Sequence, residues 1–162
     1  MPAHKLVLDE VFEQPYKLFA IHSSVEEYKL AYLLNKHLNL KLARTPKDID
    51  LHKGSENAFF AHFYFEDLQK YCTYHLVSNV AREEGMSGSG GDSLFFGEQL
   101  AVKKSFLLPE FKQVDYLVKI EDELDAVSEK MLTARIMEIP QVSTAYAIDL
   151  DRVKSKENLI FE

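Results

Sequence analysis

The sequence contains little of what small secreted or fibrous proteins depend on. It has one cysteine, Cys72, no tryptophan, five prolines and six glycines in 162 residues. A single cysteine cannot form an internal disulfide, which excludes a disulfide-stabilised scaffold and favours a reducing, cytoplasmic location. The low glycine and proline content excludes a collagen-like chain.

Long apolar stretches are also missing. No run approaches the ~20 apolar residues that a membrane-spanning helix needs. The first ten residues turn acidic too early for a signal peptide. We therefore expect a cytoplasmic protein with no membrane partner.

Positive charge is in the minority. Nineteen Lys and Arg side chains stand against twenty-six Asp and Glu, which gives a formal net charge of -7. This balance disfavours a broad phosphate-binding surface, so nucleic acid is not an expected partner. Two short basic clusters, Lys103-Lys104 and the set Arg152, Lys154 and Lys156, are typical of a solvated surface.

The residues that are present suit one folded domain. Hydrophobic residues make up 46% and charged residues 28% of the chain, as in ordinary globular proteins. The hydrophobic periodicity predicts the order β-α-β-β-β-loop-β-β-α-β. Two helices cannot cover both faces of so many strands. We therefore predict a single α+β domain over residues 1–162, with a mostly antiparallel sheet of six or seven strands and two main helices on one face.

The first helix is expected after Ser24, which forms a capping-box pattern with Glu27. An apolar stripe follows, and the helix should end near Asn39. The second helix is expected from about Asp122, because its first turn is acidic, to Pro140. Its inner stripe is predicted to be Leu124, Val127, Met131 and Ala134.

The strands are recognised by runs of alternating or continuous apolar residues. They are expected at 16–22, 40–45, 57–65, 71–80, 105–108, 114–120 and 142–148. Between the fourth and fifth strands, a Gly/Ser-rich stretch at about 84–93 predicts a flexible loop within the domain.

Two histidines invite a search for a metal site. If the hairpin between 57–65 and 71–80 closes with a four-residue turn, His62 and His75 lie directly opposite each other. A one-residue slip would instead pair His62 with Tyr74. Two imidazoles still need a third ligand, and the other histidines lack ligand spacing. We favour a cross-strand polar pair and expect no metal or cofactor.

Other candidates for chemistry have structural explanations. Cys72 lies in the middle of a predicted strand, where a buried, inert thiol is the usual case. Glu110 follows Pro109 in a tight connection, and Asp115 lies opposite the apolar face of the next strand. Turn hydrogen bonds or ion pairs are favoured over catalysis for both carboxylates. We assign no catalytic residue.

The run Leu108-Pro109-Glu110-Phe111-Lys112-Gln113-Val114-Asp115-Tyr116 resembles the signature of the IPExxxVDY family of small bacterial proteins, with Leu108 in place of the usual Ile. Further similarity lies at Ala20–Ser24 and Tyr32–Asn35, at Ile139–Tyr146 and at Lys154–Phe161. The resemblance implies a single-domain cytoplasmic protein with no assigned activity, cofactor or catalytic residue. Genes of the family tend to lie near those for ribonuclease III and pyruvate kinase.

If the signature marks a ligand or partner site, packing leaves few residues to form it. Glu110 and Asp115 are polar groups that packing does not demand, and they adjoin Tyr116. The other candidates are His22 and Ser23 at the predicted mouth of the first helix.

Three functions follow as expectations. The first is a non-enzymatic binding or regulatory domain that acts through a protein partner or as a homodimer, with a symmetric copy covering the open face of the sheet. The second is a small enzyme that uses Glu110 and Asp115 or the histidines His22, His62 and His75. The third is an RNA-associated factor with exposed aromatics for base stacking.

Overall fold

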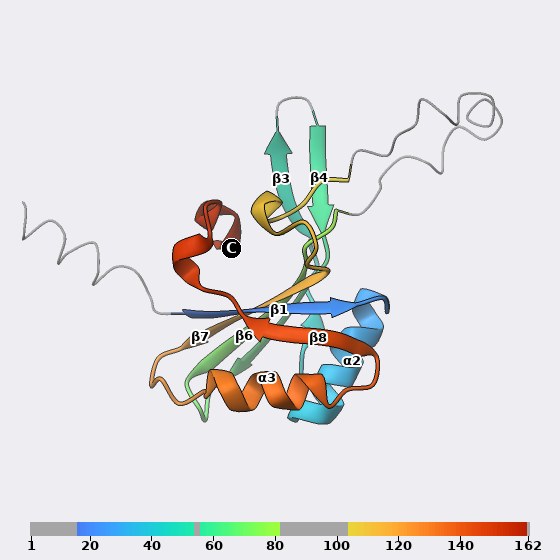
Figure 1. The fold of residues 1–162 in the computed structure, drawn as a ribbon. Helices are drawn as coiled ribbons and strands as arrows, with labels where there is room; N and C mark the ends of the chain where they lie inside the picture. Colours follow the sequence, from blue (N-terminus) through green and yellow to red (C-terminus); the bar gives the residue numbers. More distant parts are fainter. Residues whose placement is uncertain (1–15, 54–55, 82–103, 162) are drawn as a thin grey trace, which may run out of the picture.

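The computed structural model describes residues 16–53, 56–81 and 104–161, and Figure 1 shows their path. The helices and strands in these ranges are β1 (Tyr16–Ser23), α2 (Glu27–Leu38), β2 (Ala43–Arg44), β3 (Ile49–Lys53), β4 (Glu56–Phe60), β5 (His62–Asp67), β6 (Cys72–Ser78), β7 (Tyr116–Asp122), α3 (Glu129–Met137) and β8 (Val142–Ala147). Short 3₁₀ turns lie at Pro109–Phe111, Leu150–Arg152 and Lys156–Leu159. The Gly/Ser-rich loop expected at 84–93 lies outside the described residues.

Six strands form one sheet in the order β2-β5-β6-β7-β1-β8, and every neighbouring pair is antiparallel. β3 and β4 pair separately as a two-stranded sheet. β7 and its neighbour β1, which both lie inside the sheet, are buried along most of their length. This explains their nearly continuous apolar sequences, because a strand covered on both faces has no solvent side. The predicted α+β class is confirmed.

Both helices pack on the same face of the sheet, as predicted (Figure 1). Leu30 and Leu34 of α2 and Ile136 of α3 are buried against sheet residues such as Phe19 and Val118, forming the helix-side core. Within the described ranges, neither helix has the length and apolarity to cross a membrane.

The first helix starts later than expected. β1 continues through Ser23, so α2 begins at Glu27, and its N-cap residue Glu26 makes no side-chain cap. The predicted end is right: Asn39 takes a left-handed conformation with φ 56° and closes the helix. Asparagine is one of the few residues that adopt this conformation readily.

The predicted second helix starts too early in the sequence, and its predicted buried face differs from the one in the structure. β7 extends to Asp122, and α3 begins only at Glu129, where Ser128 caps it by accepting a hydrogen bond from the Met131 backbone N–H. The buried side is consequently set by Leu132 and Ile136, with Val127 packed before the helix. The predicted stripe was wrong at three positions, because Leu124, Met131 and Ala134 are exposed.

The other face of the sheet is covered by the chain itself. Leu107, Leu108 and Val114 pack there from the signature segment, and Val153 and Leu159 from the C-terminal segment. Together with sheet residues they form a second core, the tail-side core. This arrangement removes the open face on which the expectation of a homodimer rested.

The predicted strand at 57–65 is two strands. The chain breaks at Ala61, so β4 pairs with the unpredicted β3 and β5 pairs with β6. The break lets Phe60 enter the tail-side core while Phe63 enters the helix-side core. The predicted strand at 105–108 is also wrong, because this part of the chain makes a single bridge between Phe106 and Val80.

Candidate functional site

The two carboxylates of the signature are both hydrogen-bonded to backbone. Glu110 Oε2 accepts from the N–H groups of Lys154 at 2.6 Å and Ser155 at 2.7 Å, which ties the signature to the C-terminal segment. Asp115 Oδ2 accepts from the Ser23 N–H at 2.9 Å and holds the end of β1. Each carboxylate therefore joins segments that are far apart in sequence.

The remaining predicted site residues also have hydrogen-bond partners within the protein. The Tyr116 hydroxyl donates to the Val25 carbonyl at 2.5 Å, and Ser23 Oγ donates to the Gln141 carbonyl at 2.7 Å. His22 Nε2 lies 3.0 Å from the Tyr146 hydroxyl. The structure thus brings Ser23, Asp115 and Tyr116 together at the start of α2, whereas Glu110 is bonded to the C-terminal segment.

The ionisation of Glu110 fits a structural role. Burial alone would raise its pKa, but the backbone N–H groups of Glu110, Ser155 and Lys154 outweigh burial and lower the pKa. Its second oxygen, Oε1, is buried and has no hydrogen-bond partner among the described residues. A carboxylate held ionised in this way is a poor proton donor at neutral pH.

The signature loop itself is held by Asn79, which the sequence reasoning missed. Its side chain is fully buried; Nδ2 donates to the Phe111 carbonyl at 2.8 Å and the Val114 carbonyl at 2.9 Å. Oδ1 accepts from the Leu108 N–H at 2.9 Å. One available signal was an amide-bearing residue at the end of an otherwise apolar strand, since a buried amide requires partners.

The histidine pair does form, but with a different register from the one predicted. β5 and β6 pair His62 with Val77 and Tyr64 with His75, so the two histidines are diagonal neighbours on the tail side of the sheet. Their rings stack with centroids 5.1 Å apart, and His62 Nε2 lies 2.9 Å from His75 Nδ1. The ring of Phe161 lies 5.1 Å from each of them.

Burial keeps both imidazoles neutral. It lowers the pKa of His62 to about 4, with a smaller contribution from Arg44. Burial also lowers the pKa of His75, helped by the neighbouring His62 and by Lys119. Nearby, Lys119 Nζ donates to the Leu159 carbonyl at 2.8 Å and lies over the Tyr16 and Phe161 rings. Over the described part of the chain, no three His, Cys, Asp or Glu residues gather where they could hold a metal ion.

An open apolar groove lies on the helix side, where the end of α2, the start of β6 and α3 meet. We call it the α3 groove, and its volume is about 500 Å³. Its aliphatic wall consists of Leu38, Leu40, Val127, Met131 and Leu132, with Leu124 and Ala126 at the rim. The rest of its lining is Lys70, Cys72, Tyr74, Ser128 and Arg135. Pockets that bind small molecules typically measure ~300–1,000 Å³.

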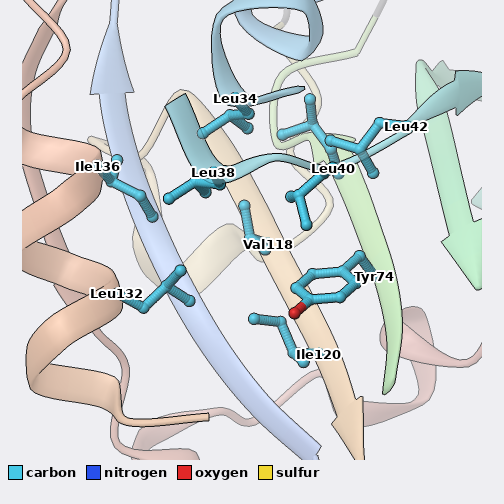
Figure 2. A pocket seen from close by; sticks show the side chains of 10 residues that line it. Leu34, Leu38, Leu40, Leu42, Tyr74, Val118, Ile120, Leu132 and Ile136 are labelled. Carbon is cyan, nitrogen blue, oxygen red and sulfur yellow. The ribbon is translucent and has the colours of Figure 1, made fainter. Parts of the chain in front are cut away.

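The α3 groove leads toward a narrow crevice between the helices and the sheet. This crevice, the leucine slot, shares Leu38, Leu40, Tyr74 and Leu132 with the groove, and aliphatic side chains make up its lining apart from Tyr74 (Figure 2). Figure 2 shows the Tyr74 hydroxyl on the slot side of its ring, near Ile120. The volume of the slot is about 10 Å³, so it admits no more than one water-sized group.

Tyr74 and Cys72, which line the α3 groove, both keep their protons at neutral pH. Burial raises the pKa of Tyr74 to about 12, so its hydroxyl stays protonated. Burial and the nearby Asp122 raise the pKa of Cys72 to about 11, which leaves a thiol rather than a thiolate nucleophile. Among the described lining residues, neither the Cys72 thiol nor the Tyr74 hydroxyl is therefore an activated nucleophile.

Comparisons with known proteins add no relative. No protein-family model, no curated protein and no solved structure matches the chain. The resemblance to the IPExxxVDY family consequently rests on the residues quoted above.

Proposed function

We propose that this chain is a non-enzymatic binding domain and that the α3 groove is its binding site. The observation that carries the proposal is the contrast between two sets of residues. Glu110, Asp115 and Tyr116 of the signature each hold a backbone partner, whereas apolar side chains at the groove are left in solvent. Leu124 and Met131 are 63% and 67% exposed beside the groove.

The exposed apolar rim favours binding because a ligand that covers it removes apolar surface from water, which lowers the free energy. Burying one such side chain contributes ~1.5–3 kcal/mol. A stable fold does not need these residues, since both faces of the sheet are already covered. We also propose that the protein belongs to the IPExxxVDY family and is a bacterial cytoplasmic protein, a setting that suits its single, buried thiol.

The alternatives have weaker support. A small enzyme would need convergent free polar groups, but Glu110 and Asp115 face different segments of the chain. An RNA-associated factor would need exposed aromatics beside basic residues, yet Phe60 is fully buried and the Tyr64 hydroxyl bonds to Glu66. The homodimer stays a prediction, now without the open face that motivated it.

A neutral solvatochromic dye, Nile red, tests the proposal. We expect saturable binding to the native protein with a blue-shifted emission. The Met131→Glu variant should bind the dye about tenfold more weakly, because it removes apolar surface and places a charge in the groove. Met137→Glu is the matched control, since Met137 lies on the same helix, is 50% exposed and does not line the groove.

The dye experiment has two adverse outcomes. Native protein that does not bind the dye contradicts the proposal. So does equal weakening by Met131→Glu and Met137→Glu, which would place the dye elsewhere on the surface. Circular dichroism of both variants checks that each is folded.

A further inference from the structure

We infer that the α3 groove binds an anionic amphiphile, a molecule with one aliphatic chain and one terminal acidic group such as a carboxylate. This inference rests on the binding function proposed above and names the class of ligand. Its two parts, an apolar chain and a negative end, follow from two independent features of the groove.

The apolar part follows from the wall. Leu38, Leu40 and Leu132 line both the open groove and the leucine slot, so aliphatic side chains extend from one to the other. A flexible aliphatic chain fits such an elongated surface and can place its methyl end at the mouth of the slot. The slot itself, at about 10 Å³, is too small to receive more of the chain without movement of the helices.

The negative end follows from the charge of the lining. The chain carries a net charge of -7, yet the charged residues that line the groove are both basic, Lys70 and Arg135. Lys70 approaches from the turn between β5 and β6, and Arg135 from α3, one helical turn after Met131. Both side chains are exposed and free of any ion pair among the described residues. An acidic end group at the groove would gain partners that the protein does not itself supply.

Two acidic residues near the groove, Asp122 and Asp125, pair with Lys17 and not with the basic residues of the lining. Asp122 is buried beneath Cys72, and its carboxylate accepts from the Val127 N–H at 2.7 Å and from Lys17 at 3.1 Å. Asp125, which is exposed, pairs with the same lysine at 2.6 Å. Lys17 pairs with both carboxylates and offsets one of their two negative charges, while the charged residues of the groove lining itself, Lys70 and Arg135, are both basic.

Calorimetric titration with three ten-carbon probes tests the inference. The probes are decanoate, decanol and decyltrimethylammonium, which share a chain and differ in the charge of the end group. All are used below the concentration at which they form micelles. We expect decanoate to bind about tenfold more tightly than decanol and the cationic probe to bind most weakly. Raising the salt concentration should reduce the preference for decanoate.

Charge-removing variants locate the preference. Lys70→Met and Arg135→Met should each weaken decanoate binding about three- to tenfold and leave decanol binding within about twofold. Lys130→Met is the matched control, because Lys130 is exposed on the same helix as Arg135 and does not line the groove. It should change neither affinity. The double variant Lys70→Met with Arg135→Met should bind decanoate and decanol equally.

The outcomes separate the inference from the binding function. If decanol and Nile red bind but decanoate binds no more tightly, or if the cationic probe is preferred, the inference is wrong and the binding function stands. If Nile red binds but none of the three probes does, the inference alone is wrong; if neither the dye nor any probe binds, both are wrong. If the preference for decanoate persists in the double variant, the acidic end lies elsewhere and the assignment to Lys70 and Arg135 fails.

Discussion

Replacement of Asn79 by alanine should be among the most damaging single changes in this protein. The side chain is fully buried and makes three hydrogen bonds of 2.8–2.9 Å to the backbone of the signature loop. Asn79→Ala leaves the Leu108 N–H and the Phe111 and Val114 carbonyls without this partner. An orphaned buried polar group costs ~1–3 kcal/mol.

Partial relaxation of the loop reduces the total, so we expect a loss of about 4 kcal/mol in the free energy of unfolding. This is a large share of the ~5–15 kcal/mol that stabilises a typical protein. Equilibrium unfolding in urea measures it as a lower midpoint with an unchanged slope. Asn158→Ala is the control, because Asn158 makes one such bond, to the Leu107 carbonyl at 2.8 Å, and should cost about 1 kcal/mol.

A loss below ~1 kcal/mol for Asn79→Ala, or a loss equal to that of the control, would refute this reading of the loop. Asn79→Asp gives a second check with nearly the same shape. It keeps the acceptor for the Leu108 N–H but sets a carboxylate against two carbonyls, so it should be destabilising at pH 7. Its stability should partly recover in acid, when the introduced carboxyl group protonates and can donate.

Three further predictions concern other parts of the molecule. Folding lowers the pKa of His62 from 6.5 to about 4 and also lowers the pKa of His75, so the unfolded chain binds more protons in this pH range. Thermal unfolding should therefore show that stability is lost as the pH falls from about 6.5 toward 4, and His75→Asn should flatten that dependence. Phe161→Ala removes the ring that covers both imidazoles and should cost about 1–3 kcal/mol in urea unfolding; no loss would show that the terminal segment is not packed. Cys72, with its pKa raised to about 11, should react with a thiol reagent far more slowly than glutathione at pH 8, and rapid labelling of the native protein would contradict its burial.

Much of the fold can be predicted from the sequence because the pattern of apolar and polar residues reflects which side of each helix or strand is buried. The apolar run of β1 predicted a buried strand, the alternation in β7 predicted a strand, and the leucine stripe of α2 predicted its buried face. The start of α3 could not be predicted from its acidic residues. The Asp122 carboxylate accepts the Val127 N–H, which stabilises a loop where the charge pattern favours a helical turn. The apolar residues Leu124 and Met131 then fall on the solvent side.

The candidate site was less predictable because it forms from three separated segments. Leu38 ends α2, Cys72 begins β6 and Met131 lies on α3, and the sequence gives no sign that they converge. Glu110 and Asp115 were named from the sequence because packing does not demand them, but the structure shows that both carboxylates hold the backbone of other segments. Their partners, such as the Ser23 and Ser155 N–H groups, are backbone atoms whose position depends on the finished fold.

The division between structural and binding residues is tested most directly by two variants measured in two ways. Asp115→Ala removes the acceptor of the Ser23 N–H and should lower the free energy of unfolding by about 1.5–3 kcal/mol while leaving the affinity for Nile red unchanged. Met131→Glu should weaken Nile red binding about tenfold and change stability by less than about 0.5 kcal/mol, because Met131 is 67% exposed. The reverse pattern, with Asp115→Ala stable but unable to bind and Met131→Glu binding normally, would contradict the proposed function.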